Sequence, residues 1–240
     1  MTSLTVDIGN TSIKAGFFEN NVLQSVFRFE DMNGLLLFCQ ELPYDTPIII
    51  SCVTNDDLGS FYKHFTKLIN LNHTTSLPIS NRYKTPETLG NDRLAAVTGA
   101  AFLYEGKNIL VIDAGTCIKY DFITADREYY GGSISPGIEM KFKALNQYTG
   151  KLPLVEKDNI FQLSGDSTVN AILSGVMMGS QMEMQGYIDA YADKYGDIEI
   201  IMTGGDQAFF ANRLKGTIFA EPDLVLKGLL EILKNNVPQL

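Results

Sequence analysis

Two stretches of the sequence place an aspartate at the end of an apolar strand, with a glycine-containing turn directly after it. The first is VDIGNTSIKAGFF (residues 6–18), with Asp7, Gly9 and Lys14, and the second is LVIDAGTCIKYDFI (residues 110–123). A tight turn with glycine lets backbone N–H groups approach phosphate oxygens, and hydroxyl and amide side chains add hydrogen-bond donors. Lys14 supplies a positive charge, and Asp7 suits a metal-bound water. These residue types predict a site for phosphate groups.

Aligning the two stretches superposes Asp7 on Asp113 and Gly9 on Gly115. One such turn is explained equally well by an ordinary β-turn. Folding neither requires nor favours an aspartate at two matching strand ends, so the repeated pattern favours a function. A repeat half a chain apart also predicts a duplicated domain that faces itself across a cleft. We therefore expect an α/β protein with two similar lobes, residues 1–106 and 107–240, joined by a short hinge near residues 105–108.

The elements that must position these turns follow from hydrophobic periodicity and turn residues. In the first half we expect strands at residues 4–8, 13–18, 22–29 and 47–53 and a weak strand at 75–79, with helices at 32–42, 58–70 and 94–106. In the second half we expect strands on both sides of the second turn, a third strand in YYGGSISPG, a long helix at 167–195, a strand at 198–205 and a terminal helix at 223–236.

The stretch LGNDRLAA places Gly90, Asp92 and Arg93 just ahead of a helix. An aspartate there is most often an N-cap. An arginine just inside a helix N-terminus opposes the helix dipole, which suggests that Arg93 is placed to hold a ligand carboxylate with two hydrogen bonds. Both interpretations remain open for this stretch taken alone.

Three weaker signals have plain structural explanations beside functional ones. The sequence TGGD (residues 203–206) could let a flat base and a ribose approach the backbone, or it is a simple strand-to-helix turn. Thr168 either caps a helix or reaches a ligand, and Tyr83 precedes Gly90 in the same irregular stretch. Neither a GxxxxGK[ST] loop nor a GxGxxG motif after a strand is present, so a nucleotide would bind by another architecture.

Composition excludes several classes of function. The 240 residues carry a net charge of −9 without a run of Lys or Arg, so we expect no nucleic-acid partner. The apolar stretches are too short to span a bilayer and the N-terminus is unlike a signal peptide, so we expect no membrane partner. The three cysteines are isolated, which is typical of a reduced, cytoplasmic chain. An anionic substrate would need local positive charges.

Six motifs in order, DIGNTSIK, LGNDRLAA, DAGT, GGSISPGIEM, GDSTVNAILSG and EPDLVLKGLL, resemble those of type III pantothenate kinases over nearly the whole chain. That family is a branch of the acetate kinase, hexokinase and actin superfamily, in which two ribonuclease-H-like lobes with mixed sheets flanked by helices clasp ATP in the cleft. The resemblance implies ATP-dependent phosphorylation of pantothenate to 4'-phosphopantothenate, the first step of coenzyme A biosynthesis. It also implies a homodimer.

The resemblance further implies a role for individual residues. Asp92 would be the proton acceptor, and Asp113 would bind a monovalent cation, K⁺ or NH₄⁺, alongside Mg²⁺ on the ATP. The residues implied to bind ATP are Asp7, Ile8, Gly9, Asn10, Thr11, Ser12, Ile13, Lys14 and Thr116. Those implied to bind pantothenate are Tyr83, Gly90, Asn91, Asp92, Arg93 and Thr168.

The sequence departs from the family pattern directly after DAGT, where Cys117, Ile118 and Lys119 stand in place of the common Ala-x-Thr. This departure leaves the contacts next to Thr116 open, including any part played by Lys119. Alternatives to a pantothenate kinase are another small-molecule kinase of the same fold, a regulator that binds ATP without turnover, and turns that are purely structural. The long helix is apolar on more than one face, which favours burial against a second copy.

Overall fold

The computed structural model describes residues 1–53 and 58–237, and the chain divides into two compact units. The first unit comprises Met1–Gly106, Thr124–Tyr130 and Asp223–Leu240, and the second comprises Lys107–Ile123 and Gly131–Pro222. The chain first passes from one unit to the other between Gly106 and Lys107, which is where we expect the first lobe to end. The C-terminal segment differs from the expected continuous ranges, because it packs within the first unit.

The sheet of the first unit has five strands in the order β3-β2-β1-β4-β5. The strands are β1 (Thr2–Ile8), β2 (Ile13–Glu19), β3 (Val22–Phe29), β4 (Ile48–Cys52) and β5 (Leu68–Asn70). The first three form the expected antiparallel meander, and β4 and β5 continue the sheet in parallel. The parallel strand β4 is buried on both faces, which explains its run of isoleucines.

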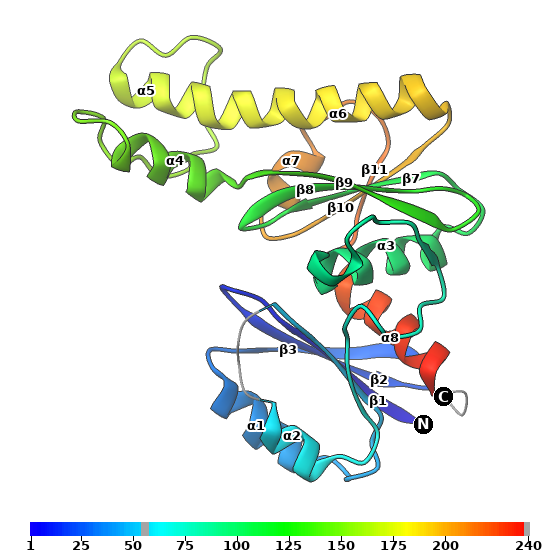
Figure 1. Cartoon of the computed structure of the whole chain (residues 1–240). Coiled ribbons are helices and arrows are strands. Elements are labelled where there is room, and N and C mark those ends of the chain that lie inside the picture. The colour runs from blue at the N-terminus through cyan, green and yellow to red at the C-terminus, as the bar shows by residue number, and fades with distance from the viewer. Residues whose placement is uncertain (54–57, 238–240) are drawn as a thin grey trace. The chain divides into compact units, whose positions relative to one another are not determined.

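Helices cover both faces of this sheet (Figure 1). On one face lie α1 (Met32–Gln40) and α2 (Gly59–His64), against Ile48 and Ile50 of β4. On the other face, Ile49 packs with α3 (Asn91–Leu103) and α8 (Leu224–Asn236). The helices α3 and α8 approach closely, because a Cβ on Gly99 would lie 2.6 Å from the carbonyl oxygen of Leu224. This contact holds α8 in the first unit.

Two expectations for the first half were wrong. The helix expected at 58–70 ends at His64, because Phe65 is extended and Leu68–Asn70 pairs with β4 as strand β5. The strand expected at 75–79 lies slightly later, as the two-residue strand β6 (Ser80–Asn81). It pairs with Glu128 and Tyr129, the residues of β9 (Glu128–Pro136) that belong to the first unit.

The second unit repeats the strand order of the first, as β9-β8-β7-β10-β11. Its further strands are β7 (Ile109–Ala114), β8 (Cys117–Ile123), β10 (Glu199–Thr203) and β11 (Ile218–Ala220). The directions match as well: β7 and β8 are antiparallel, whereas β10 is parallel to β7 and to β11. The same order and directions in both units confirm the duplication predicted from the two aspartate turns.

The helices of the second unit are α4 (Ile138–Gln147), α5 (Thr168–Leu173), α6 (Gly179–Tyr195) and α7 (Gln207–Ala211). A π-helical segment, η2 (Ser174–Met178), joins α5 to α6 in one long helix, as expected (Figure 1). Met177 and Met184 of this helix are buried in the core of the unit, whereas Met182 is exposed. In the described part of the chain, no helix combines the length and apolar character needed to cross a membrane.

Candidate active site

The first aspartate turn joins β1 to β2. Asp7 lies opposite Lys14 in the hairpin, and the amide of Gly9 donates to the carbonyl oxygen of Ser12 at 3.1 Å, which closes the turn. On the neighbouring parallel strand, Ser51 lies beside Asp7 and its hydroxyl donates to the Asp7 Oδ1 at 3.1 Å. The hairpin register therefore fixes an aspartate between a lysine and a buried serine.

The turn residues divide into an exposed polar group and a buried apolar pair. Asn10, Thr11 and Ser12 are exposed at the tip of the turn. Ile8 and Ile13 at its base are only 1% and 7% exposed, within the core of the first unit. Of the residues predicted to bind ATP, these two can offer a ligand only their backbone groups.

The second turn, between β7 and β8, has the same arrangement. Asp113 lies opposite Lys119 in the hairpin and beside Thr203 on the parallel strand β10. The Lys119 Nζ is 2.8 Å from the Asp113 Oδ2, and the two side chains are 19% and 18% exposed. The amide of Gly115 donates to the carbonyl oxygen of Cys117 at 3.2 Å. Each unit thus holds an aspartate between a lysine and a hydroxyl residue.

Two other glycine motifs of the second unit pack on this second turn. Gly204 of TGGD has φ +93, and a Cβ there would lie 2.5 Å from the Asp113 Oδ1. Gly137 of GGSISPG donates its amide to the carbonyl oxygen of Thr116 at 3.1 Å, with no room for a Cβ. Motifs that are far apart in the sequence therefore meet at Asp113 to Thr116.

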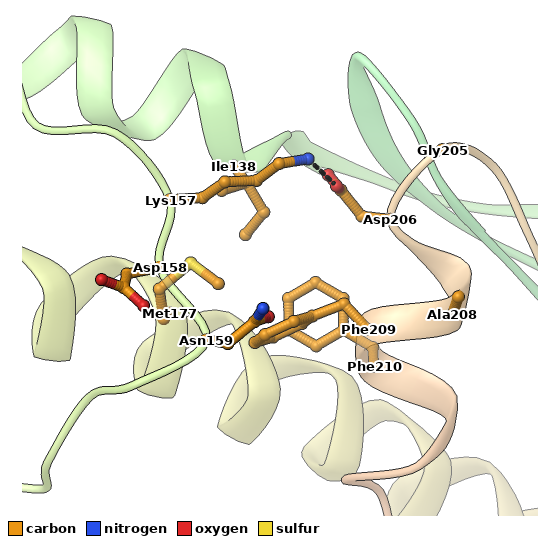
Figure 2. A pocket seen from close by; sticks show the side chains of 10 residues that line it. All are labelled: Ile138, Lys157, Asp158, Asn159, Met177, Gly205, Asp206, Ala208, Phe209 and Phe210. Atoms are coloured by element: carbon orange, nitrogen blue, oxygen red, sulfur yellow. Dashed lines mark hydrogen bonds and ion pairs between the residues drawn. The ribbon is translucent and has the colours of Figure 1, made fainter.

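A pocket of about 380 Å³ opens beside TGGD. It is lined by Ile138, Lys157, Asp158, Asn159, Met177, Gly205, Asp206, Ala208, Phe209 and Phe210 (Figure 2). Lys157 reaches across one side of it to Asp206, with Nζ 2.7 Å from Oδ1, and this hydrogen bond raises the pKa of Lys157. Apolar walls with a few polar groups are typical of small-molecule sites. The sequence leaves open whether TGGD contacts a nucleotide base or is a simple strand-to-helix turn, and Gly205 and Asp206 of this motif line the pocket.

The GNDR sequence lies at the start of α3 in the first unit. Gly90 is the N-cap, so the N-cap role considered for Asp92 is wrong, and Asp92 lies in the first turn of the helix. A Cβ on Gly90 would lie 2.5 Å from the Asp92 Oδ1. That same oxygen accepts the amide hydrogen of Arg93 at 2.9 Å, and the Asn91 side chain donates to the Leu71 carbonyl oxygen at 2.8 Å. The local backbone therefore holds Asp92 in place.

Arg93 and Tyr83 lie together. The guanidinium carbon of Arg93 is 5.7 Å from the centroid of the Tyr83 ring, and Arg93 is only 5% exposed. The Tyr83 ring is in turn nearly parallel to that of Tyr129, with centroids 6.4 Å apart. A buried guanidinium against an aromatic face is a preorganised cation for a carboxylate ligand. The structure thus brings together two residues that the resemblance assigned to one pocket.

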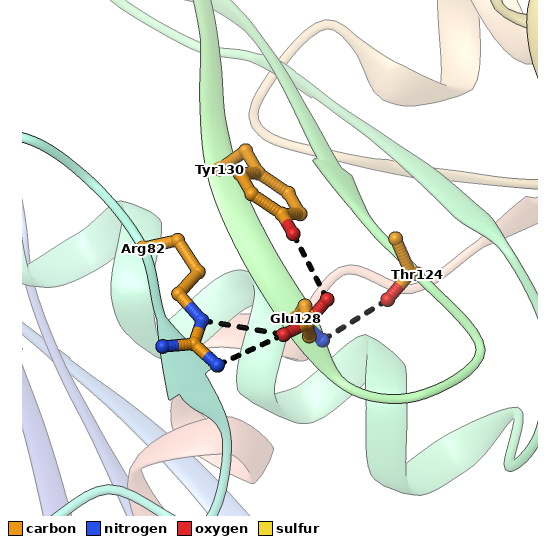
Figure 3. A network of polar contacts seen from close by, with 4 residues as sticks. All are labelled: Arg82, Thr124, Glu128 and Tyr130. Atoms are coloured by element: carbon orange, nitrogen blue, oxygen red, sulfur yellow. Dashed lines mark hydrogen bonds and ion pairs between the residues drawn. The ribbon is translucent and has the colours of Figure 1, made fainter.

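A polar network anchors the strand that leads into Tyr83 (Figure 3). The Arg82 guanidinium donates twice to the Glu128 Oε1, at 3.2 and 3.0 Å, and the Tyr130 hydroxyl donates to Oε2 at 2.9 Å. These hydrogen bonds, that of Tyr130 first, lower the pKa of Glu128. The amide of Glu128 also donates to the Thr124 hydroxyl at 3.1 Å. Because Arg82 is exposed, the network fixes the register of β6 more than it stabilises the fold.

Thr168, the remaining residue of the predicted site, belongs to the second unit. It begins α5 and is exposed. The capping role falls to Ser167, whose hydroxyl accepts the amide hydrogen of Asn170 at 3.2 Å. The hydroxyl of Thr168 is therefore not needed as the helix cap.

The carboxylates suit one kind of metal site. Among residues 1–53 and 58–237, no group of three or more His, Cys, Asp or Glu side chains could hold a metal ion. Mg²⁺ in kinases is instead held by one or two carboxylates together with the phosphates of the substrate. Asp7, whose Oδ1 accepts a hydrogen bond from the Ser51 hydroxyl, fits that mode.

Little in the sequence indicates a functional role for Ser51 or Lys157. Ser51 is a polar residue at the end of the buried strand PIIISCV, and that contrast is its one signal. Lys157 lies in an irregular segment, and its partner Asp206 is 49 residues away. A contact between residues so far apart in the sequence cannot be predicted from local hydrophobic periodicity.

Comparisons with known proteins agree with the motifs. The family model of type III pantothenate kinases matches residues 3–190. The type III pantothenate kinase of Phocaeicola vulgatus is 44% identical over an alignment of 241 positions that covers 98% of this chain and 98% of the relative. Those of Christiangramia forsetii and Cytophaga hutchinsonii are 44% and 43% identical, over 99% and 98% of this chain and 100% of each relative.

Solved structures share the fold. A protein described as a Baf family transcriptional activator from Campylobacter jejuni has a TM-score of 0.64 at 25% identity, over 99% of this chain and all of its own. An activator of 2-hydroxyisocaproyl-CoA dehydratase from Clostridium difficile, with bound ADPNP, has a TM-score of 0.54 at 12% identity, over 100% of this chain and 98% of its own. With the duplicated sheets, these likenesses identify the actin-like α/β fold of two ribonuclease-H-like units. The relatives and the family match establish that the chain belongs to the type III pantothenate kinase family.

Proposed function

We propose that this protein transfers the γ-phosphoryl group of ATP to the primary hydroxyl of pantothenate, which gives 4'-phosphopantothenate in the first step of coenzyme A biosynthesis. One observation carries the proposal within the family: the local backbone holds the Asp92 carboxylate at the start of α3, and the next residue, Arg93, is buried with its guanidinium against the Tyr83 ring. Asp92 can act as a base toward a hydroxyl and Arg93 as a cation for a carboxylate, and pantothenate carries both of these groups.

The roles on the pantothenate side follow from this geometry. Asp92 accepts the hydroxyl proton as the new O–P bond forms. Arg93 pairs with the pantothenate carboxylate through its planar guanidinium, and the face of the Tyr83 ring orients that guanidinium. Gly90 leaves the space that the Asp92 carboxylate occupies, and Asn91 ties the start of the helix to Leu71.

The roles on the ATP side fall to the two turns. The backbone from Asp7 to Lys14, with the exposed side chains at its tip, donates to the phosphates, and Lys14 adds a positive charge. Thr116 contacts ATP from the second turn. Mg²⁺, when bound to the phosphates, neutralises their charge. Such placement, more than covalent chemistry, supplies most of the rate in phosphoryl transfer.

We also propose that a positive charge lies beside the Asp113 carboxylate. The family resemblance names a monovalent cation there, K⁺ or NH₄⁺, and an anionic substrate in a protein of net charge −9 needs local neutralisation.

We also assign the reaction to the cytoplasm. Cys39, Cys52 and Cys117 all carry free thiols, which suits a reducing compartment.

We further propose that the active form is a homodimer, with Thr168 beside the substrate. In the second unit, Ile134, Tyr148, Leu154, Ile160 and Leu163 are each more than half exposed. Several of these lie close in sequence to α4 and to the start of α5, which Thr168 begins. Exposed apolar side chains in such number are typical of an interaction surface.

One set of experiments tests both the identity of the acceptor substrate and the role of Asp92 as the base. ADP release is measured with pantothenate and with a panel of sugars and small acids, and ADPNP binding is measured by calorimetry. Asp92→Asn should lower kcat by about 10²–10⁴, the range for a positioned base, and leave ADPNP affinity unchanged. Glu87→Gln is the matched control, because it removes an exposed carboxylate from the same stretch, and it should behave as the wild type.

Three outcomes would contradict the proposal. Release of ADP with a sugar in preference to pantothenate would indicate another kinase of the same fold. ADPNP binding without turnover of any acceptor would indicate a regulator. Activity of Asp92→Asn within about tenfold of the wild type would remove Asp92 from the role of base.

A further inference from the structure

The Lys119 ammonium already lies at the carboxylate to which the family resemblance assigns a monovalent cation. Lys119 and Asp113 lie directly opposite in the β7–β8 hairpin, and Nζ is 2.8 Å from Oδ2. Both side chains are less than one-fifth exposed, so this is a largely buried, charge-assisted hydrogen bond. A lysine side chain ends in a substituted ammonium, the same chemical group as the NH₄⁺ ion.

The other carboxylate oxygen of Asp113 faces backbone. Cβ atoms built on Gly204 and Gly115 would lie 2.5 and 3.1 Å from the Asp113 Oδ1. A K⁺ ion at this carboxylate would have to share it with the Lys119 ammonium, and the two positive charges would repel each other. The residues present therefore do not fit a free monovalent cation coordinated by Asp113.

We propose that the ammonium group of Lys119 takes the place of the monovalent cation at Asp113. This inference rests on the proposed function for its link to turnover, but it makes a separate statement about ATP binding. The charge that other members would draw from solution is built into the chain, two residues after Cys117, where the sequence departs from the family pattern. ATP binding and turnover are then independent of K⁺ and NH₄⁺.

The plainer explanation is a cross-strand ion pair that only stabilises the hairpin. The two explanations differ in what the loss of the ammonium does. A purely structural pair predicts that its removal lowers stability and leaves the cation requirement as it was. A built-in cation predicts that its removal creates a requirement for a free ion, which then occupies the vacated position.

The experiment compares the wild type with Lys119→Met, which keeps the length of the side chain and removes its charge. ADPNP affinity is measured by calorimetry in tetramethylammonium chloride and in KCl at equal ionic strength, without pantothenate. The wild-type affinities should agree within about twofold. Lys119→Met should bind at least about tenfold more weakly in tetramethylammonium, and KCl or NH₄Cl should restore the affinity.

Lys107→Met is the matched control, because Lys107 makes ion pairs with Asp197 and Glu199 in the same unit, at 3.7 and 3.5 Å. It should bind ADPNP as the wild type does in both salts. Wild-type affinity that rises more than about tenfold with K⁺ would overturn the inference. So would a folded Lys119→Met protein whose affinity is independent of the salt.

The wild-type comparison holds even if Lys119→Met does not fold. ADP release with pantothenate in the two salts gives a second readout. Cation-independent ADPNP binding without turnover of pantothenate would support the inference and reject the proposed substrate. Turnover of pantothenate with a strict K⁺ requirement would support the proposed substrate and reject the inference about Lys119.

Discussion

The backbone of Gly204 lies against the carboxylate of Asp113. Gly204 has φ +93, and a Cβ on this residue would lie 2.5 Å from the Asp113 Oδ1 and from the Ala114 carbonyl carbon. Gly205, the next residue, has no positive φ, and a Cβ there would meet no atom within 4 Å. The two neighbouring glycines of TGGD therefore face opposite constraints. One is required by the contact with Asp113, and the other is open toward the pocket.

Gly204→Ala should raise KM for ATP and lower the melting temperature. The left-handed conformation alone costs roughly 1–2 kcal/mol for a residue with a Cβ, and the contact with Asp113 adds to it. Gly150→Ala is the control, because it adds the same methyl group in the second unit without strain or contact, at a residue that does not line the pocket. Steady-state kinetics with varied ATP and thermal melts measure both effects. Equal behaviour of the two variants would show that the approach of Gly204 to Asp113 is unimportant.

Arg93→Lys should weaken recognition of the pantothenate carboxylate. Lysine keeps the charge but loses the planar fork that holds a carboxylate with two hydrogen bonds. We expect KM for pantothenate to rise about 10- to 100-fold, as for the loss of a charge-assisted contact of 1.5–3 kcal/mol, with KM for ATP unchanged. Kinetics with each substrate varied in turn measure this difference.

Pantothenol, which has an alcohol in place of the carboxylate, separates recognition from folding. It carries no partner for the guanidinium, so the wild type should use it poorly and Arg93→Lys should lose little more. An equal loss with pantothenate and pantothenol would place Arg93 in a structural role, through its contact with the Tyr83 ring.

The partly buried network around Glu183 predicts a pH-dependent contribution to stability. Burial raises the pKa of Glu183, but hydrogen bonds from Lys141, Ser135 and Tyr120 outweigh it and the net shift is downward. The Lys141 Nζ lies 2.7 Å from Oε2, and the Tyr120 hydroxyl lies 2.9 Å from Oε1. A lowered folded pKa stabilises the protein above the unfolded pKa of about 4.3. That stabilisation is lost as the pH falls through the folded pKa.

Glu183→Gln should therefore lower stability at pH 7 by about 1.5–3 kcal/mol, the range for hydrogen bonds to a charged group. The difference from the wild type should shrink as the pH falls below about 4.3. Thermal melts between pH 7 and pH 3 measure it, with Glu156→Gln, an exposed carboxylate of the same unit, as control. A difference that stays constant over this range would exclude the proposed linkage.

Local patterns were enough to predict the strands around the two turns, because an aspartate and a glycine at a strand end mark both the turn and its register. Once Asp113 is placed at the end of β7, a short turn puts Lys119 opposite it. Periodicity also located α3 and α8. It could not show that α8 packs in the first unit, because that depends on the close approach of Gly99 to the backbone of α8, 125 residues later at Leu224.

The missed elements are held by distant partners. Leu68–Asn70 became a strand because β4 offers it a parallel edge, which no local pattern encodes. Ser80 and Asn81 form β6 only through pairing with Glu128 and Tyr129. In the site, the motif GNDR was visible in the sequence, but the stacking of Tyr83 on Tyr129 was not.

We expect the protein to form a dimer through its long helix. Along α6, Gly179 and Gly186 share a face with the exposed Met182, since they lie three residues before it and four residues after it. A Cβ on either of these glycines would meet no atom within 4 Å. Glycines on a helix face allow a close approach by a second helix, and a twofold axis would place the same face opposite. We expect light scattering at low micromolar concentration to give twice the chain mass of 26.6 kDa.

Met182→Glu should shift this mass toward the monomer, because a twofold axis would bring two new carboxylates together in an apolar contact. Leu37→Glu is the matched control: it adds the same charge at an apolar residue that is 66% exposed on α1 of the first unit. That variant should remain dimeric with wild-type kinase activity. If Thr168 acts beside the substrate only in the dimer, the Met182→Glu monomer should lose kcat/KM for pantothenate and keep its affinity for ADPNP. A wild-type monomer with full kinase activity would overturn both the assembly and its link to catalysis.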